Sequence, residues 1–221
     1  MHDLAPFIDH TLLKPDATAK DIEQLCQEAR THHFHSVCVN SSRVAQAYAL
    51  LADTQVVVAS VVGFPLGGMD SDAKRYETEL AIDLGAEEID LVLNVGKLKD
   101  GDDKFVLREL RDVVEAASDR VIKVILETCL LTREEIIRAC HLVVDSGAQF
   151  VKTSTGFSKS GATIEDVRLM REAVGKDFGV KASGGIRDRA TAEAMIQAGA
   201  TRLGTSAGVA IVSGQVAAGE Y

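Results

Sequence analysis

The chain has 221 residues, 46% hydrophobic and 26% charged, which is normal for a globular protein of one or two domains. Its net charge of −9 and the lack of a dense Lys/Arg run exclude bulk attraction to nucleic acid or to an anionic membrane. A small anionic ligand is still allowed, because local fields can oppose the net charge.

The N-terminus and the cysteines indicate the compartment. The first ten residues, MHDLAPFIDH, show no signal peptide pattern, and no run approaches the length of a membrane span. Cys26, Cys38, Cys129 and Cys140 form no C-x-x-C pair, which argues against a zinc ribbon or a redox motif. We expect a cytoplasmic protein with reduced thiols.

Short runs rich in β-branched residues recur along the chain, and helix-patterned segments lie between them. The predicted strands are residues 7–13, 36–40, 56–64, 88–95, 121–128, 150–155, 179–185 and 201–206. The clearest helical segments are 18–30, 71–86, 132–148 and 188–200. Thr132 and Glu135 have the spacing of a capping box, and Gly147 is a helix stop signal.

Eight strands alternating with helices predict a single-domain (β/α)₈ TIM barrel over residues 1–221, with a short flexible C-terminal tail at about 214–221. The rival is a doubly wound open sheet. The count of eight favours the barrel, as does the lack of a G-x-G-x-x-G sequence after the first strand.

The alternation of side chains along each strand predicts which residues enter the barrel. On the fifth, sixth and seventh strands these include Lys123, Lys152 and Lys181. The fourth strand sends Asp90, Val92 and Asn94 inward, and the first sends Asp9 and Thr11 inward. We expect Lys152 in a wet, charged barrel mouth rather than in a sealed core. The alternative is a structural ion-pair cluster, which rarely stabilises a fold more than apolar packing would.

Two adjacent lysines suit one kind of chemistry. A lysine amine is a nucleophile only when neutral, and a nearby cation together with desolvation lowers its pKa. Lys152 beside Lys181 therefore predicts a Schiff base with a carbonyl substrate. The residues themselves do not decide which of the two is the nucleophile.

Glycine-rich loops after the seventh and eighth strands predict an anion site. In such barrels these two loops often bind phosphate through backbone N–H groups. The substrate is thus expected to be a phosphorylated carbonyl compound. The candidate residues are Ser183, Gly184, Gly185, Ile186, Arg187, Gly204, Thr205 and Ser206.

Six motifs in order, HTLLKPDAT, GFPLG, EIDLVLNVG, VIKVILET, VKTSTGF and VKASGGIR, closely resemble those of the deoxyribose-phosphate aldolase family. The resemblance runs from about Ile8 to Gly208. It implies a (β/α)₈ barrel without metal or organic cofactor. It also implies reversible cleavage of 2-deoxy-D-ribose 5-phosphate to D-glyceraldehyde 3-phosphate and acetaldehyde, in deoxyribonucleotide catabolism.

The resemblance assigns roles by motif. Lys152 would form the Schiff base, Lys181 would depress the pKa of Lys152 and relay protons, and Asp90 would donate and accept protons. The expected substrate-binding set adds to the loop residues Asp9, Thr11, Lys123, Thr153 and Gly156. Many family members have a lysine where this chain has Phe157, so Lys159 or Arg187 would have to replace it in holding phosphate.

Other functions would need features that this sequence lacks or would not need the features that it has. A zinc aldolase would need histidines at the carboxyl ends of the strands, whereas His32, His33 and His35 precede the second strand and are expected in a solvated loop. A phosphate-binding isomerase or epimerase has no need of adjacent lysines, and a sugar-phosphate sensor would form no Schiff base. A homodimer or homotetramer is left open, since dimers are common. Tyr221 would either assist a proton step or belong to a frayed terminus.

Overall fold

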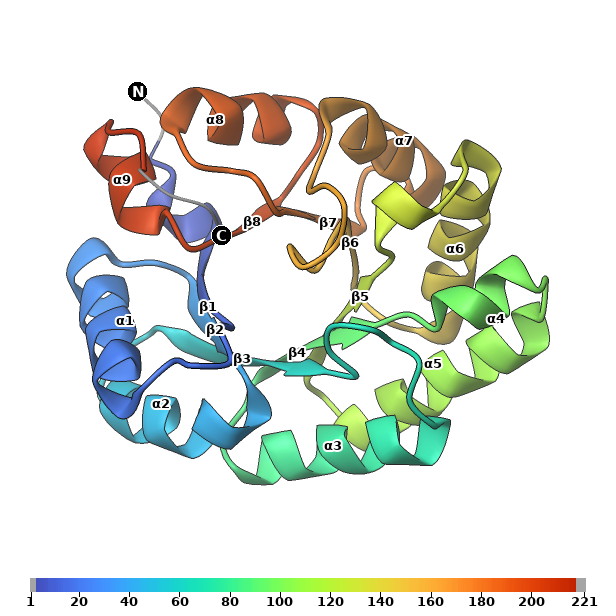
Figure 1. The fold of residues 1–221 in the computed structure, drawn as a ribbon, viewed down its shortest axis with the longest axis horizontal. Helices are drawn as coiled ribbons and strands as arrows, with labels where there is room; N and C mark the ends of the chain where they lie inside the picture. The colour runs from blue at the N-terminus through green and yellow to red at the C-terminus, as the bar shows by residue number, and fades with distance from the viewer. Residues whose placement is uncertain (1–2, 218–221) are drawn as a thin grey trace.

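The computed structural model describes residues 3–217 as a closed barrel of parallel strands surrounded by helices (Figure 1). Each strand pairs with the next one in the chain, and the last strand pairs with the first. The predicted (β/α)₈ barrel is confirmed, and the open sheet is wrong. The strands are β1 (Ile8–Leu12), β2 (Ser36–Val39), β3 (Val57–Val62), β4 (Glu88–Val92), β5 (Val121–Ile125), β6 (Phe150–Lys152), β7 (Gly179–Ser183) and β8 (Arg202–Thr205).

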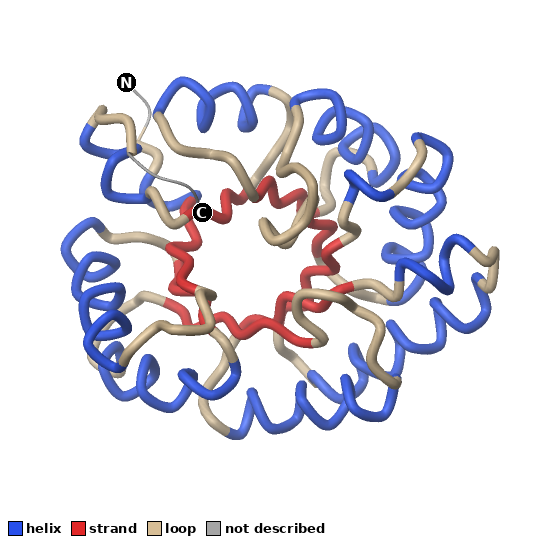
Figure 2. The backbone as a smooth tube through the Cα atoms, in the orientation of Figure 1, coloured by secondary structure: helices blue, strands red, loops and turns tan. Residues whose placement is uncertain are grey.

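The helices form a ring outside the strands (Figure 2). None of those in residues 3–217 has the length and apolar composition needed to cross a membrane. The α-helices are α1 (Ala19–His32), α2 (Val44–Leu51), α3 (Ser71–Asp83), α4 (Val95–Lys99), α5 (Asp103–Ala117), α6 (Arg133–Ser146), α7 (Ile164–Val174), α8 (Arg189–Gln197) and α9 (Gly208–Ser213). Short 3₁₀ turns are η1 (Ala5–Phe7), η2 (Ser41–Arg43) and η3 (Thr128–Leu130).

Helix α6 begins and ends at the predicted signals. The Thr132 hydroxyl accepts from the Glu135 N–H, and the Glu135 carboxylate accepts from the Thr132 N–H, which completes the capping box. Gly147 ends the helix at φ +90°, a left-handed conformation that suits glycine. Local sequence therefore sets where this helix meets β6.

The core lies between the strands and the helices. Ile89, Leu91, Val151 and Val180 are fully buried on the outer faces of their strands, as the alternation predicts. One prediction of this register is wrong: β4 ends at Val92, so Asn94 does not continue its inward face. The backbone turns into α4 there, and the Asn94 side chain caps that helix.

The predicted C-terminal tail follows α9. The backbone N–H of Ala217 donates to the Arg187 carbonyl at 3.2 Å, so the last described residue lies beside the loop after β7. Tyr221 is outside the described residues.

A buried ion pair joins two helices to β4. The Lys74 ammonium on α3 lies 2.7 Å from a Glu109 carboxylate oxygen on α5 and 3.0 Å from the Val92 carbonyl. Both side chains are fully buried, and the Ser71 hydroxyl donates to the second Glu109 oxygen. The pair therefore holds the carboxyl end of β4 against the helical layer.

Replacing Lys74 with Met leaves the Glu109 carboxylate buried without its cation. We expect Lys74→Met to lower the free energy of unfolding by about 3–5 kcal/mol, measured by urea titration. Lys74→Met combined with Glu109→Leu should lose much less, because no buried charge is left unpaired.

The neighbouring residue provides a matched control. Arg75 pairs with Glu79 on the solvent-exposed side of the same helix, and Arg75→Met should cost about 0–1 kcal/mol. Equal losses for Lys74→Met and Arg75→Met would contradict the importance of the buried pair.

Candidate active site

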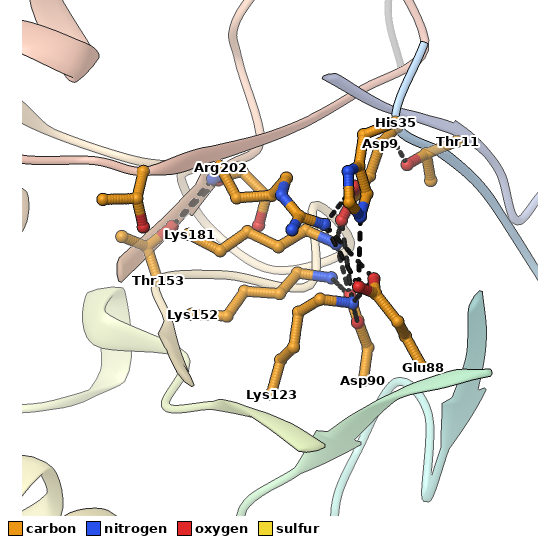
Figure 3. A network of polar contacts seen from close by, with 12 residues as sticks. Asp9, Thr11, His35, Glu88, Asp90, Lys123, Lys152, Thr153, Lys181 and Arg202 are labelled. Carbon is orange, nitrogen blue, oxygen red and sulfur yellow. Dashed lines mark hydrogen bonds and ion pairs between the residues drawn. The ribbon is translucent and has the colours of Figure 1, made fainter. Parts of the chain in front are cut away.

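The carboxylate of Asp90 lies at the centre of the barrel and contacts three lysines (Figure 3). Its Oδ2 atom is 2.7 Å from the Nζ of Lys152 and 2.7 Å from the Nζ of Lys181. Its Oδ1 atom is 2.8 Å from the Nζ of Lys123. One carboxylate oxygen therefore bridges the two lysines that the sequence picked out as the reacting pair.

Strand register brings these residues together. Asp90 pairs with Lys123 across β4 and β5, and Lys152 pairs with Lys181 across β6 and β7. Because side chains alternate, residues at these positions point into the barrel while their neighbours face the helices. The inward direction predicted for all three lysines is confirmed.

Asp9 on β1 extends the cluster. Its Oδ2 atom lies 2.5 Å from the Nζ of Lys181 and 3.7 Å from the Nζ of Lys123. The Thr11 hydroxyl donates to the Asp9 backbone carbonyl, and its side chain is half-buried one layer nearer the mouth. Asp9 thus belongs to the central cluster, whereas Thr11 lies above it.

Sequence reasoning missed two charged residues of the interior. Glu88 starts β4 and lies 2.6 Å from Lys123, and Arg202 starts β8 and lies 3.2 Å from Glu88 and 3.0 Å from Asp9. Both fall on the inward register, since Glu88 is two residues before Asp90 and Arg202 is paired with Lys181. The same alternation that revealed the lysines could have found them.

The prediction of a wet barrel mouth around Lys152 is wrong. Lys152 is 3% exposed, and Lys123, Lys181, Asp9 and Asp90 are fully buried. Burial of this many charges requires that each have a partner of opposite sign. The carboxylates of β1 and β4 supply those partners.

The three lysines differ in their pKa shifts. Burial lowers the pKa of Lys152; Asp90 opposes this shift, Lys181 adds to it, and the pKa stays below its ordinary value. Burial acts the same way on Lys181, but Asp9 and Asp90 outweigh it and raise the pKa. Burial also acts to lower the pKa of Lys123, but its three carboxylate partners outweigh burial and raise this pKa. Lys152 is the lysine that loses its proton most readily.

Asp90 remains ionised in this setting. Burial on its own would raise the pKa of its carboxyl, but the three lysines overcome that effect and hold the pKa well below its usual range. An ionised carboxylate can accept a proton from a neighbouring ammonium or hydroxyl. The centre of the barrel therefore contains a base next to a readily neutralised amine.

The loops at the carboxyl ends of β6, β7 and β8 are linked to one another. The Thr153 hydroxyl donates to the Ser183 carbonyl at 3.1 Å, and that of Thr205 donates to the Ile186 carbonyl at 2.7 Å. Gly184 and Gly185 have φ values of +85° and +79°. These two hydrogen bonds connect the rim of loops at the carboxyl ends of β6, β7 and β8, where the sequence predicts the phosphate site.

The outer residues of the predicted set are spread along this rim. Gly156, Gly185, Arg187 and Ser206 are exposed, whereas Ser183 and Gly204 are buried below them. Phe157, which stands at the position of the family lysine, is exposed and meets the Phe64 ring edge-on at 5.3 Å between centroids. Lys159 is exposed two residues further along.

One group of side chains at the floor of the barrel has metal-ligating atoms. Asp9, His35 and Glu88 offer one ligand atom each within 4.8 Å of one another. The carboxylates of this group already contact Lys123, Lys181 and Arg202. A divalent cation would have to compete with three resident cations, so the donor set fits a metal poorly. His35, predicted in a solvated loop, keeps a side chain that is 32% exposed, and its Nε2 also lies 3.2 Å from Glu88.

Two other side chains that could act as a nucleophile or a base, Cys38 and His10, have contacts that indicate a structural role. Cys38 is fully buried, and burial raises the pKa of its thiol to about 11, which suits packing better than nucleophilic attack. The Nε2 of His10 lies 2.7 Å from Glu28 of α1, on the helix side of β1.

Comparisons with known proteins agree with this geometry. Residues 4–214 match the model of the DeoC/LacD family aldolases. A deoxyribose-phosphate aldolase of Alkaliphilus oremlandii is 57% identical over 96% of each chain, and one of Clostridium botulinum strain Loch Maree is 58% identical over 95% of this chain and 99% of the relative. The tetrameric structure of deoxyribose phosphate aldolase from Aeropyrum pernix has a TM-score of 0.89 at 33% identity, covering 95% of this chain and 89% of that one.

The parallel barrel has a cluster of lysines and carboxylates at its centre, and its relatives are lyases. These features together define an enzyme of the aldolase class. The chain belongs to the DeoC/LacD aldolase family. The alternatives of a phosphate-binding isomerase and a non-catalytic sensor find no support among these relatives.

Gly204 leaves room for Lys181. A Cβ atom at position 204 would lie 3.0 Å from the Cε of Lys181 and 2.9 Å from the Cβ of Ser183. We expect Gly204→Ala to displace Lys181 from Asp90 and to lower kcat about tenfold to a hundredfold, because misplacement by a fraction of an ångström is costly in catalysis. Steady-state aldol cleavage measures this.

Gly68 provides the matched control, since an added Cβ there meets no atom within 4 Å. Gly68→Ala should keep the kcat of the unmodified enzyme. Unchanged kcat in Gly204→Ala would show that Lys181 tolerates the shift.

Proposed function

We propose that this aldolase reversibly cleaves 2-deoxy-D-ribose 5-phosphate to D-glyceraldehyde 3-phosphate and acetaldehyde through a Schiff base on Lys152. It would act as one cytoplasmic aldolase domain over residues 1–221, in deoxyribonucleotide catabolism. The named relatives support the substrate, and the lysine cluster supports the mechanism.

One observation carries the choice of nucleophile. Among the residues that the structure describes, Lys152 contacts one carboxylate, Lys181 contacts two and Lys123 contacts three. A lysine with fewer anionic partners loses less when it gives up its proton. Lys152 is also the only one of the three with measurable exposure, at 3%, so it lies nearest the entrance for substrate.

The first half of the reaction makes the Schiff base. The neutral Lys152 amine adds to C1 of the open-chain sugar and forms a carbinolamine. Asp90, 2.7 Å from both amines, accepts the proton released from Lys152 nitrogen, and Lys181 donates a proton to the departing hydroxyl. Water leaves and a protonated imine remains.

The second half breaks the carbon–carbon bond. The C3 hydroxyl gives its proton to Asp90 through a water, the electrons of the C2–C3 bond move toward the iminium nitrogen, and glyceraldehyde 3-phosphate is released as the aldehyde. The enamine left on Lys152 is protonated at C2, and water then hydrolyses the imine to free acetaldehyde. Asp90 and Lys181 are placed to return the protons, through a water for the more distant carbon.

The phosphate would bind at the rim formed by the loops after β7 and β8. Gly184 and Gly185, with positive φ, turn the backbone between β7 and α8 so that N–H groups can reach an anion. Arg187 and Lys159 are the exposed cations nearest in sequence to these loops and to Phe157. The tetrameric relative makes a homotetramer a reasonable assembly, with a homodimer as the alternative.

Borohydride reduction tests the Schiff base. We expect acetaldehyde followed by borohydride to leave a two-carbon adduct on Lys152, identified by mass spectrometry of peptides. Lys152→Ala should lose the adduct and nearly all turnover, because no other lysine there contacts so few carboxylates.

An adduct on Lys181 would keep the reaction and reverse the two lysine roles. Absence of any adduct on the folded protein would contradict the proposed function as a whole.

The phosphate site can be tested by comparing two substrates. Arg187→Met should raise KM for deoxyribose 5-phosphate about threefold to thirtyfold, the loss of one charge-assisted hydrogen bond, and leave turnover of unphosphorylated deoxyribose unchanged. Lys159→Met tests the other cation in the same way. If neither changes the preference for the phosphorylated sugar, backbone N–H groups alone hold the phosphate.

A further inference from the structure

The floor of the barrel carries a layer of charge below the reacting lysine. The Nη1 of Arg202 lies between Asp9 at 3.0 Å and Glu88 at 3.2 Å. Its guanidinium also lies over the Phe150 ring, 5.4 Å from the centroid. In Figure 3 the Arg202 side chain is drawn next to that of Lys181, and its guanidinium is directed toward the carboxylates of β1 and β4. The proposed mechanism gives no part to this arginine or to Glu88.

The charges of the interior do not balance when every group is ionised. Within the part of the chain that the structure describes, and apart from His35, which is partly exposed and carries a charge only when protonated, the ion-paired cluster holds four cations and three carboxylates. The cations are Lys123, Lys152, Lys181 and Arg202, and the carboxylates are Asp9, Glu88 and Asp90. One cation too many is buried, and an unpaired buried charge is expensive. Release of one proton from the cluster makes it neutral.

The contacts decide which group releases that proton. Arg202 does not lose its proton in proteins, so its charge is fixed. Lys123 and Lys181 each contact at least two carboxylates, whereas Lys152 contacts one. The surplus charge therefore falls on Lys152, which the chemistry needs in the neutral form.

Resting on the function proposed above, we propose that Arg202 and Glu88 are positioning residues that set the charge of Lys152 from the floor of the barrel. Arg202 supplies a fixed positive charge, so that the cluster has a net charge of about +1 whenever Lys152 is protonated. Glu88 supplies the negative charge that keeps this net charge from being larger. Neither residue touches the reacting atoms. Each acts through the charge balance of Asp9, Asp90 and the lysines.

The groups that face Lys152 are consistent with this balance. Asp90 on β4 contacts it, and Lys181 on β7, Lys123 on β5 and Asp9 on β1 lie in the same cluster. Other ionisable neighbours are held elsewhere: Cys38 on β2 has a raised pKa and stays neutral, Glu127 beyond β5 accepts from the Thr155 hydroxyl, and His35 before β2 contacts Glu88.

Both floor residues stay charged over the working range of pH. Burial alone would raise the pKa of Glu88, but Lys123 and His35 bring it to about 2. The carboxylates raise the pKa of Arg202 above its ordinary value against the effect of burial. The floor therefore acts as a constant field on Lys152.

Opposite changes at the two floor residues test the proposal. The probe is the rate of acetaldehyde trapping on Lys152 by borohydride as a function of pH, which follows the neutral fraction of the amine. Arg202→Gln removes the surplus charge, so the midpoint should rise by about one pH unit or more, which slows trapping about tenfold at pH values below both midpoints. Glu88→Gln leaves a larger surplus, and the midpoint should fall.

The double variant and a conservative variant separate charge from packing. Arg202→Gln with Glu88→Gln removes one charge of each sign and should return the midpoint close to that of the unmodified protein. Arg202→Lys keeps the charge and should leave it nearly unchanged. His35→Gln should shift the midpoint less than Glu88→Gln, because Glu88 keeps its contacts with Lys123 and Arg202.

A structural role alone would not give shifts of opposite sign that cancel. The proposal is overturned if Arg202→Gln, folded and still modified on Lys152, keeps the unmodified midpoint, or if both single variants move it the same way. Should Arg202→Gln fail to fold, a Glu88→Gln midpoint that does not fall overturns it equally. No adduct on Lys152 in the unmodified protein would instead contradict the proposed function.

Discussion

The Asp90 carboxylate is the interaction on which the rest of the site depends. It contacts three lysines from three neighbouring strands, at 2.7 to 2.8 Å. Without it, Lys152 would lose its one carboxylate partner, and Lys181 and Lys123 would keep only Asp9 and Glu88 against their mutual repulsion and desolvation. The same carboxylate connects the amine that would attack with the amine that would relay protons, so stability and reactivity rest on one side chain.

The sequence was sufficient for the barrel and for the inward direction of the three lysines. A repeat of eight strands with helices between them predicts the fold, and the two-residue period of a strand predicts that Lys123, Lys152 and Lys181 point inward. These inferences succeed because they depend on local geometry. A strand buried by helices on one face must place its polar residues on the other.

The sequence does not predict how little of the charged interior is exposed to solvent. The exposure of Lys152 depends on which carboxylates arrive from distant strands, and Arg202 meets Asp9 across 193 positions in the chain. His35 likewise looks like part of a solvated histidine run until the fold brings it to Glu88. The end of β4 was missed for another reason, since Asn94 caps a helix that periodicity alone did not reveal.

The pairing of β8 with β1 connects closure of the barrel with the charge of its interior. Asp9 lies on the first strand of the barrel and its ion-pair partner Arg202 on the last, 193 positions apart in the chain. Opening the seam between these two strands would separate Arg202 from Asp9 and admit water to the cluster, and hydration moves the pKa of a buried lysine toward its ordinary value. The reactivity proposed for the Lys152 amine would therefore depend on closure of the barrel.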